Sequence, residues 1–229
     1  MREVGAIAPR RFASPRGWYL AAEVGQLVGV SGDRIGQWAR HGYIHSSQST
    51  SSPRIYSFQD VAEAMAVHEL LRRGVRHDEI RRAIENLREE YGDWPLTDAP
   101  LGVTTYTHGR KRETLLLGYA TTHSEIGRGH GRQMVLSVQD LQYINVLLRR
   151  GGWAIRELPD VEHIQVDPDR LSGRPTIRDR RLPVGKVAEL AKSGFSGLRI
   201  LRADYELERS EIVDAVRWYD AVIRYEQAA

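Results

Sequence analysis

The stretch G-R-P-T-I-R-D-R-R-L-P-V, Gly173–Val184, decides how the C-terminal part of the chain folds. Pro175 and Pro183 exclude an ordinary helix here. The Thr-Ile pair between them favours an extended backbone. We therefore expect a loop or short strand from which four arginines project: Arg174, Arg178, Arg180 and Arg181.

Three helices are expected after this stretch, in a helix-turn-helix-like arrangement. Residues 184–193 carry a common apolar face made by Val184, Val187, Ala188 and Ala191. A Gly-Phe turn then leads to a short helix over 196–203. The third helix, over 209–225, has apolar residues at i, i+4, i+7 and i+11, namely Ile212, Val216, Tyr219 and Ile223.

The segment 163–219 resembles the small domain of VapB-type antitoxins, which reads I-x-x-D-P-x-x-x-x-G-R-P-x-I-x-G-T-R-I-P-V before three helices. The matching positions are Ile164, Asp167, Pro168, Gly173, Arg174, Pro175, Ile177, Arg181, Pro183 and Val184. Asp179 stands where that family usually has Gly, Arg180 where it has Thr, and Glu208 replaces the usual Ser or Thr cap of the third helix. The resemblance implies a partner, a PIN-domain ribonuclease toxin that is inhibited by direct binding, and repression of the shared promoter.

A second pattern lies near the N-terminus. Leu20, Val24 and Leu27 form an apolar stripe, Gly29-Val30 favours a turn, and Ser31 is a good N-cap for a following helix. This order predicts a helix-turn-helix.

The second helix of that pattern has two unlike faces. Ile35, Trp38 and Ala39 are expected to face inward, opposite a polar face of Asp33, Arg34, Gln37, Arg40 and His41. Gln pairs with adenine edges and Arg with guanine edges in the major groove. The predicted operator contacts are therefore Ser31, Arg34, Gln37 and Arg40; the alternative is a protein-interaction face without DNA.

A polar stretch over 45–53 follows and predicts a wing between two short strands, with Arg54 placed to touch phosphate. Ser57 and Asp60 have the spacing of a capping box at the start of paired helices over 58–73 and 77–90. The whole segment 17–90 resembles the MerR-like winged-helix superfamily. The chain has no Cys, which excludes a thiolate metal sensor.

The middle of the chain is less distinctive. Residues 103–107 and 113–120 predict a hairpin with a basic tip over 108–112, followed by a strand over 133–136 and a helix over 137–150. We expect a small α+β connector there that serves as a dimerisation region. A Gly-rich stretch over 127–132 and the histidines His108, His123 and His130 match no phosphate-binding or metal-ligand motif.

Composition limits the class of protein. The 229 residues carry a net charge of +3 and are 41% hydrophobic, which is ordinary for globular domains. No run approaches 18 apolar residues and the first residues lack an apolar signal core, so neither a membrane span nor a secretory signal is expected. We therefore expect a cytoplasmic protein.

The sequence thus predicts a mainly α (α+β) chain of three parts: a MerR-like winged-helix DNA-binding domain over 17–92, an α+β connector over 100–152 and a helical domain of antitoxin type over 160–226. The predicted function is that of the antitoxin of a type II toxin–antitoxin system, a homodimer that binds operator DNA and a PIN-domain toxin. No catalytic residue, metal or cofactor is expected, and an enzyme is disfavoured. The alternative is a free-standing MerR-like transcription regulator that senses a small effector.

The four arginines give a hypothesis for inhibition. PIN-type nucleases hold a divalent metal with clustered carboxylates, so an arginine entering that pocket would compete with metal and RNA phosphate. Arg174, Arg178, Arg180 and Arg181 are the predicted toxin contacts. The alternatives are contacts with DNA phosphate, or salt bridges within the domain to Asp167, Asp169 or Asp179.

Overall fold

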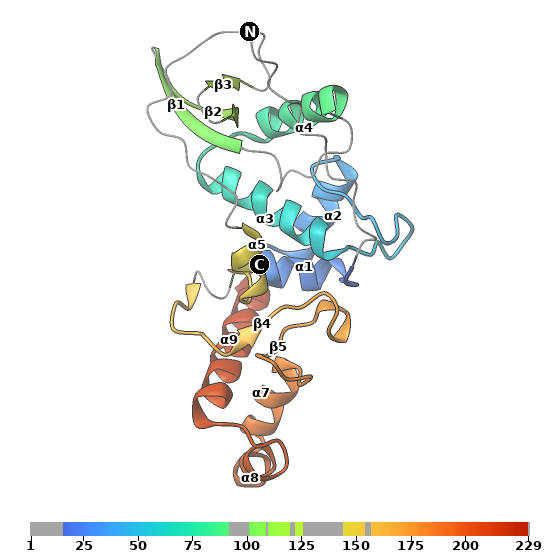
Figure 1. Ribbon diagram of the computed structural model, residues 1–229, viewed down its shortest axis with the longest axis vertical. Helices are drawn as coiled ribbons and strands as arrows, with labels where there is room; N and C mark the ends of the chain where they lie inside the picture. Colours follow the sequence, from blue (N-terminus) through green and yellow to red (C-terminus); the bar gives the residue numbers. More distant parts are fainter. Residues whose placement is uncertain are drawn as a thin grey trace. The chain divides into compact units, whose positions relative to one another are not determined.

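The computed structural model describes residues 16–91, 101–108, 110–119, 122–125, 144–153 and 157–228. The described chain is mostly helical with two small antiparallel sheets, which confirms the predicted fold class (Figure 1). Contacts divide the chain into two compact units: residues 1–15 with 66–142, and residues 16–65 with 143–229. These units are defined by contacts and not by independent folding, so the three domain boundaries expected from the sequence stay a prediction. No helix among the described residues is both long and apolar enough to cross a membrane.

The predicted N-terminal helix-turn-helix is present in the second unit. Helix α1, Ala21–Val28, is followed by a turn and by α2, Gly32–Arg40. Ser31 is the N-cap of α2, and its Oγ accepts a hydrogen bond from the Arg34 amide at 3.3 Å. One expectation was wrong: Leu20 does not join the buried stripe but precedes α1 with 48% of its surface exposed, where its N–H donates to the Glu23 carboxylate.

The wing is anchored by a buried carboxylate. Residues Ser49 and Ile55 exchange two backbone hydrogen bonds of 3.1 and 3.0 Å and form an isolated β-bridge, where the sequence predicted two short strands. Helix α3, Phe58–Arg72, begins with the predicted capping box, in which Ser57 N donates to Asp60 Oδ2 at 2.8 Å and Asp60 N donates to Ser57 Oγ at 3.2 Å. The same Asp60 oxygen accepts from the amide and the hydroxyl of Ser47, so one buried side chain joins wing and helix.

In the first unit, α4, His77–Tyr91, precedes a three-stranded meander. Strands β1, Leu101–His108, and β2, Arg110–Tyr119, pair antiparallel with Leu101 opposite Leu117 and His108 opposite Arg110. The predicted hairpin is confirmed, but the pairing continues through most of the stretch expected as its tip. Strand β3, Thr122–Glu125, was not predicted. The expected strand over 133–136, the Gly-rich stretch over 127–132 and His130 lie outside the described residues.

The C-terminal part belongs to the second unit. Helix α5, Ile144–Arg149, is the described part of the helix expected over 137–150. A two-stranded sheet pairs β4, Ile164–Gln165, with β5, Thr176–Ile177, and the 3-10 turn η1, Leu171–Gly173, lies between them.

The three predicted helices of this part are present: α7, Val184–Lys192; α8, Phe195–Ala203; and α9, Arg209–Ala228. Helix α7 lies against α9 (Figure 1). The inward face of α9 differs from the prediction, because its buried apolar residues are Ile212, Ala215, Trp218 and Val222. The expected Val216, Tyr219 and Ile223 are only half-buried. A 20-residue helix with apolar residues on two adjacent faces does not reveal from its pattern which face is deeper.

The opening motif and the helix-turn-helix meet at Tyr19, whose side chain is 1% exposed. Its backbone exchanges two hydrogen bonds with Tyr56, and the neighbouring Trp18 N donates to Ser172 O at 2.9 Å. Gly173 has a φ of +88°, and a Cβ there would lie 1.8 Å from Tyr19 Oη. Only glycine satisfies both the backbone conformation and this approach.

Replacing Asp60 by Ala is expected to lower the free energy of unfolding by about 3 kcal/mol, because the α3 cap is lost, the amide of the buried Ser57 loses its acceptor, and the wing loses both bonds from Ser47. Urea titration followed by circular dichroism measures the change. Glu89→Ala, an exposed position in α4, is the control and should change it by less than about 0.5 kcal/mol. Equal effects of the two substitutions would refute the anchoring role of Asp60.

Candidate DNA interface and arginine cluster

The outer face of α2 has the form expected of a recognition helix. Ile35 and Trp38 are 0% and 2% exposed and fix the helix in the unit, whereas Arg34, Gln37 and Arg40 are exposed. The three exposed residues follow one another at intervals of three, slightly less than one helical turn. They therefore form a row of hydrogen-bonding side chains that begins at the N-terminus of α2.

Arg54 lies at the end of the wing and is half-buried. Its guanidinium donates to Ser46 Oγ at 3.4 Å. That single contact leaves other N–H donors of the guanidinium available. Burial raises the pKa of the nearby Tyr56 phenol, which therefore stays neutral although Arg54 and Arg40 are close.

A cluster of His45, Asp60 and Glu63 was not recognised in the sequence. One ligand-type atom of each residue lies within 4.8 Å of the others. Glu63 accepts from the His45 amide at 3.0 Å and contacts its Nδ1 at 2.9 Å, and Asp60 holds Ser47 and Ser57. Both carboxylates accept hydrogen bonds from the wing, so we assign the cluster to wing anchoring. Its signal in the sequence was two acidic residues three apart within the apolar first half of α3.

The four arginines of the opening motif have different surroundings. Arg180 donates to Glu211 Oε1 at 3.1 Å, to Tyr205 O at 3.0 Å and to Glu206 O at 3.2 Å, which ties the motif to the turn before α9. Arg178 donates to the carbonyl of Glu162. Arg174 faces Glu23 of α1 at 3.4 Å.

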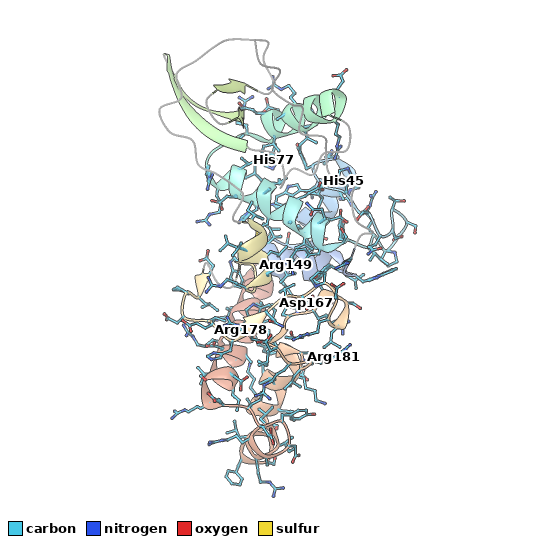
Figure 2. All side chains as sticks on the ribbon, viewed as in Figure 1. His45, His77, Arg149, Asp167, Arg178 and Arg181 are labelled. Atoms are coloured by element: carbon cyan, nitrogen blue, oxygen red, sulfur yellow. The ribbon has the colours of Figure 1, made fainter. Side chains whose placement is uncertain are left out.

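Arg181 is exposed, and no hydrogen bond or ion pair of its side chain is recorded with the described residues. Arg178 and Arg181 lie apart on the C-terminal part, so the four side chains do not converge on one point (Figure 2).

The acceptors of these arginines differ from the aspartates expected from the sequence. Asp167 pairs with Arg170 at 3.9 Å and Asp169 with Arg16 at 2.9 Å. Asp179 has a φ of +59°, in the left-handed region. Glycine adopts this conformation most readily, which is consistent with the Gly that VapB-type antitoxins usually have at this position. Asp is among the other residues that tolerate a left-handed backbone.

Comparison with known proteins identifies two domains. Residues 19–87 match the family described as MerR HTH family regulatory protein, and residues 164–219 match the family described as Protein of unknown function (DUF433). The MerR-like expectation is thus confirmed, and the chain carries a DNA-binding type of domain. The C-terminal family is DUF433, and a VapB-type antitoxin family is not shown.

The fold is shared with solved structures. The X-ray crystal structure of Rv2018 from Mycobacterium tuberculosis matches with a TM-score of 0.53 and 17% sequence identity, over 90% of this chain and 99% of that chain. No curated protein matches. At this identity the likeness supports the fold alone, and the function is argued from the site.

Arg34→Ala and Gln37→Ala are each expected to weaken binding to the preferred DNA sequence by about 1–3 kcal/mol, with a much smaller loss on unrelated DNA. The preferred sequence is obtained by selection from a random DNA pool, and affinities are measured by fluorescence anisotropy. Arg202→Ala on α8 serves as a charge-matched control. Equal losses on both DNAs would exclude base recognition by α2.

Proposed function

We propose that the protein is a DNA-binding repressor that acts as the antitoxin of a type II toxin–antitoxin pair. The observation that carries the DNA-binding part is the exposed row Arg34, Gln37 and Arg40 on a rigidly packed α2 within a MerR-type domain. Ser31 and Arg54 flank this row, one at the helix N-terminus and one on the wing. In this proposal α2 enters the major groove, and Ser31 and Arg54 contact phosphates.

A homodimer on an inverted repeat fits this geometry, because one short helix reads only a few base pairs. Two copies bound one helical turn of DNA apart, about 34 Å, would double the contacts and supply the specificity of an operator. The proposed toxin partner is a PIN-domain ribonuclease, and its promoter is the operator.

The proposed toxin contact rests on the exposed cations of the C-terminal part. Arg181 has no recorded partner among the described residues and is therefore available to enter an acidic, metal-holding pocket. Arg180 is committed to Glu211 and two carbonyls, and so its role in this proposal is to hold the motif in shape. To contact the toxin, Arg174 would have to leave Glu23, and Arg178 would have to leave the carbonyl of Glu162.

Helix α8 supports a protein partner independently. Phe195 is 85% exposed and Leu198 is 39% exposed. With Arg199 and Arg202 they occupy positions i, i+3, i+4 and i+7, which share one helical face. An exposed aromatic beside arginines is typical of protein-binding hot spots and complements an acidic partner.

The second candidate function is a free-standing regulator that senses a small effector. It is favoured by a cavity in the second unit, lined in part by Leu27 of α1 and Trp218 of α9. A protein partner at equal stoichiometry supports the first function, and operator affinity that depends on a small ligand supports the second.

Purification of the protein at endogenous level from its native host is expected to yield a nuclease at near one-to-one stoichiometry. Its RNA cleavage should be blocked in the complex and return when the proteins are separated. Mass spectrometry identifies the partner, and a labelled RNA substrate reports cleavage. Recovery of the protein alone on its operator would contradict the antitoxin function and leave DNA binding intact.

Arg180→Ala and Arg181→Ala are expected to affect different properties: the first stability, the second toxin inhibition. The first should lower the free energy of unfolding by about 2 kcal/mol, since it leaves the buried Glu211 without its cation. The second should change stability by less than about 0.5 kcal/mol but weaken inhibition of the toxin. Denaturant titration and a nuclease assay measure the two effects, with Phe195→Ala as a second contact variant. Full inhibition by both Arg181→Ala and Phe195→Ala would exclude these surfaces.

A further inference from the structure

A cavity of about 300 Å³ lies inside the second unit, where α1 of the helix-turn-helix meets α7 and α9 of the C-terminal part. Its inner wall is apolar and consists of Leu27, Val184, Trp218 and Val222, all of them buried. A 150 Å³ apolar cavity can hold benzene, so a cavity of this size has room for a bicyclic ring.

The mouth of the cavity is rich in hydrogen-bond donors. Arg174 lies there with its side chain 66% exposed, and its Nε lies 3.4 Å from Glu23 Oε1. Glu23 in turn accepts from Leu20 N at 2.9 Å. The carboxylate thus has a partner at each oxygen, and Arg174, with five N–H donors and a largely exposed side chain, has donors to offer a ligand.

The N-terminus of α7 opens at the same place. Pro183, Val184 and Gly185 line the cavity as the cap and first two residues of this helix. Pro183 provides no side-chain cap, and no partner is recorded among the described residues for the amide of Gly185. An uncapped helix N-terminus attracts anions through its free N–H groups and its dipole.

Gly185 keeps this corner open. A Cβ built on it would come no closer than 3.9 Å to any neighbour, the nearest atom being Tyr219 Cε2, so packing does not require glycine here. Alanine would favour the helix by about 1 kcal/mol over glycine. The missing side chain gives access to the helix amides from the cavity.

Two buried donors in the wall have no acceptor among the described residues, Tyr19 Oη and Trp218 Nε1. Burial raises the pKa of the Tyr19 phenol, and the nearby Glu23 and Asp167 act in the same direction, so it stays protonated. Unpaired buried donors cost free energy, and the wall therefore favours acceptors over further donors.

We propose that this cavity binds a small organic monocarboxylate with an apolar, planar body. The carboxylate would be held by the guanidinium of Arg174 and the amide of Gly185, and the ring would lie against Leu27, Trp218 and Val222. This inference rests on the second candidate function and names its class of effector; ligand binding itself is measured without DNA or a toxin, so its failure is distinguishable from a failure of operator binding or of toxin inhibition.

The test uses 2-naphthoate as the probe and 2-naphthamide as its neutral isostere, with the full chain and no DNA. The indole N–H resonance of Trp218, assigned with Trp218→Phe, is followed by two-dimensional NMR. We expect saturable shifts with naphthoate and at least tenfold weaker binding of the amide. Absence of a Trp218 shift at 10 mM naphthoate, or equal affinity for the two probes, would overturn the proposal.

Three variants locate the site. Arg174→Gln should weaken naphthoate binding about tenfold and leave naphthamide binding unchanged. Gly185→Leu should fill the cavity and weaken both probes, and Gly185→Ala, a milder change, should do so less while keeping the fold. Glu189→Leu, one turn along α7 at an exposed position outside the cavity, is the control and should bind as the parent does. Unchanged naphthoate affinity in a folded Arg174→Gln or Gly185→Leu protein would overturn the assignment.

Discussion

The close approach of Gly173 to Tyr19 is the contact on which the rest of the second unit depends. Tyr19 is buried between a backbone bridge to Tyr56 and the glycine of the opening motif. The left-handed backbone of Gly173 also sets the course of the chain into the short β4–β5 sheet and so into α7. One tyrosine thus joins the entrance of the helix-turn-helix, the wing strand and the DUF433 domain.

This contact has a functional consequence. Helix α1 belongs to the same compact unit as α7 and α9. Arg174 of the opening motif faces Glu23 in the first turn of α1. A ligand or partner that displaces Arg174 acts directly beside α1, which packs on α2. Events at the C-terminal domain therefore have a short route to α2, the helix that we propose reads the operator.

Local patterns in the sequence predicted the helices, the N-cap at Ser31, the capping box at Ser57 and Asp60, and the hairpin, because each depends on neighbouring residues. Long-range features were not predictable. The partners of Arg180 lie about 25 to 31 positions away, and the wing anchor joins Ser47 to Asp60 only after the wing has folded. The deeper face of α9 and the exposure of Leu20 were missed because they depend on which surfaces meet. The four arginines looked alike in the sequence, but Arg174, Arg178 and Arg180 have different partners, which lie far away in the sequence.

Native-state hydrogen exchange tests the joining of the two parts most directly. The amides of Val24–Val28 in α1 and of Val187–Leu190 in α7 are measured in the parent and in Gly173→Ala at low denaturant concentrations. If the contact at Tyr19 unites them, both segments open with the same free energy and both lose protection equally in the variant. Loss of protection in α7 alone, with α1 unchanged, would contradict the account.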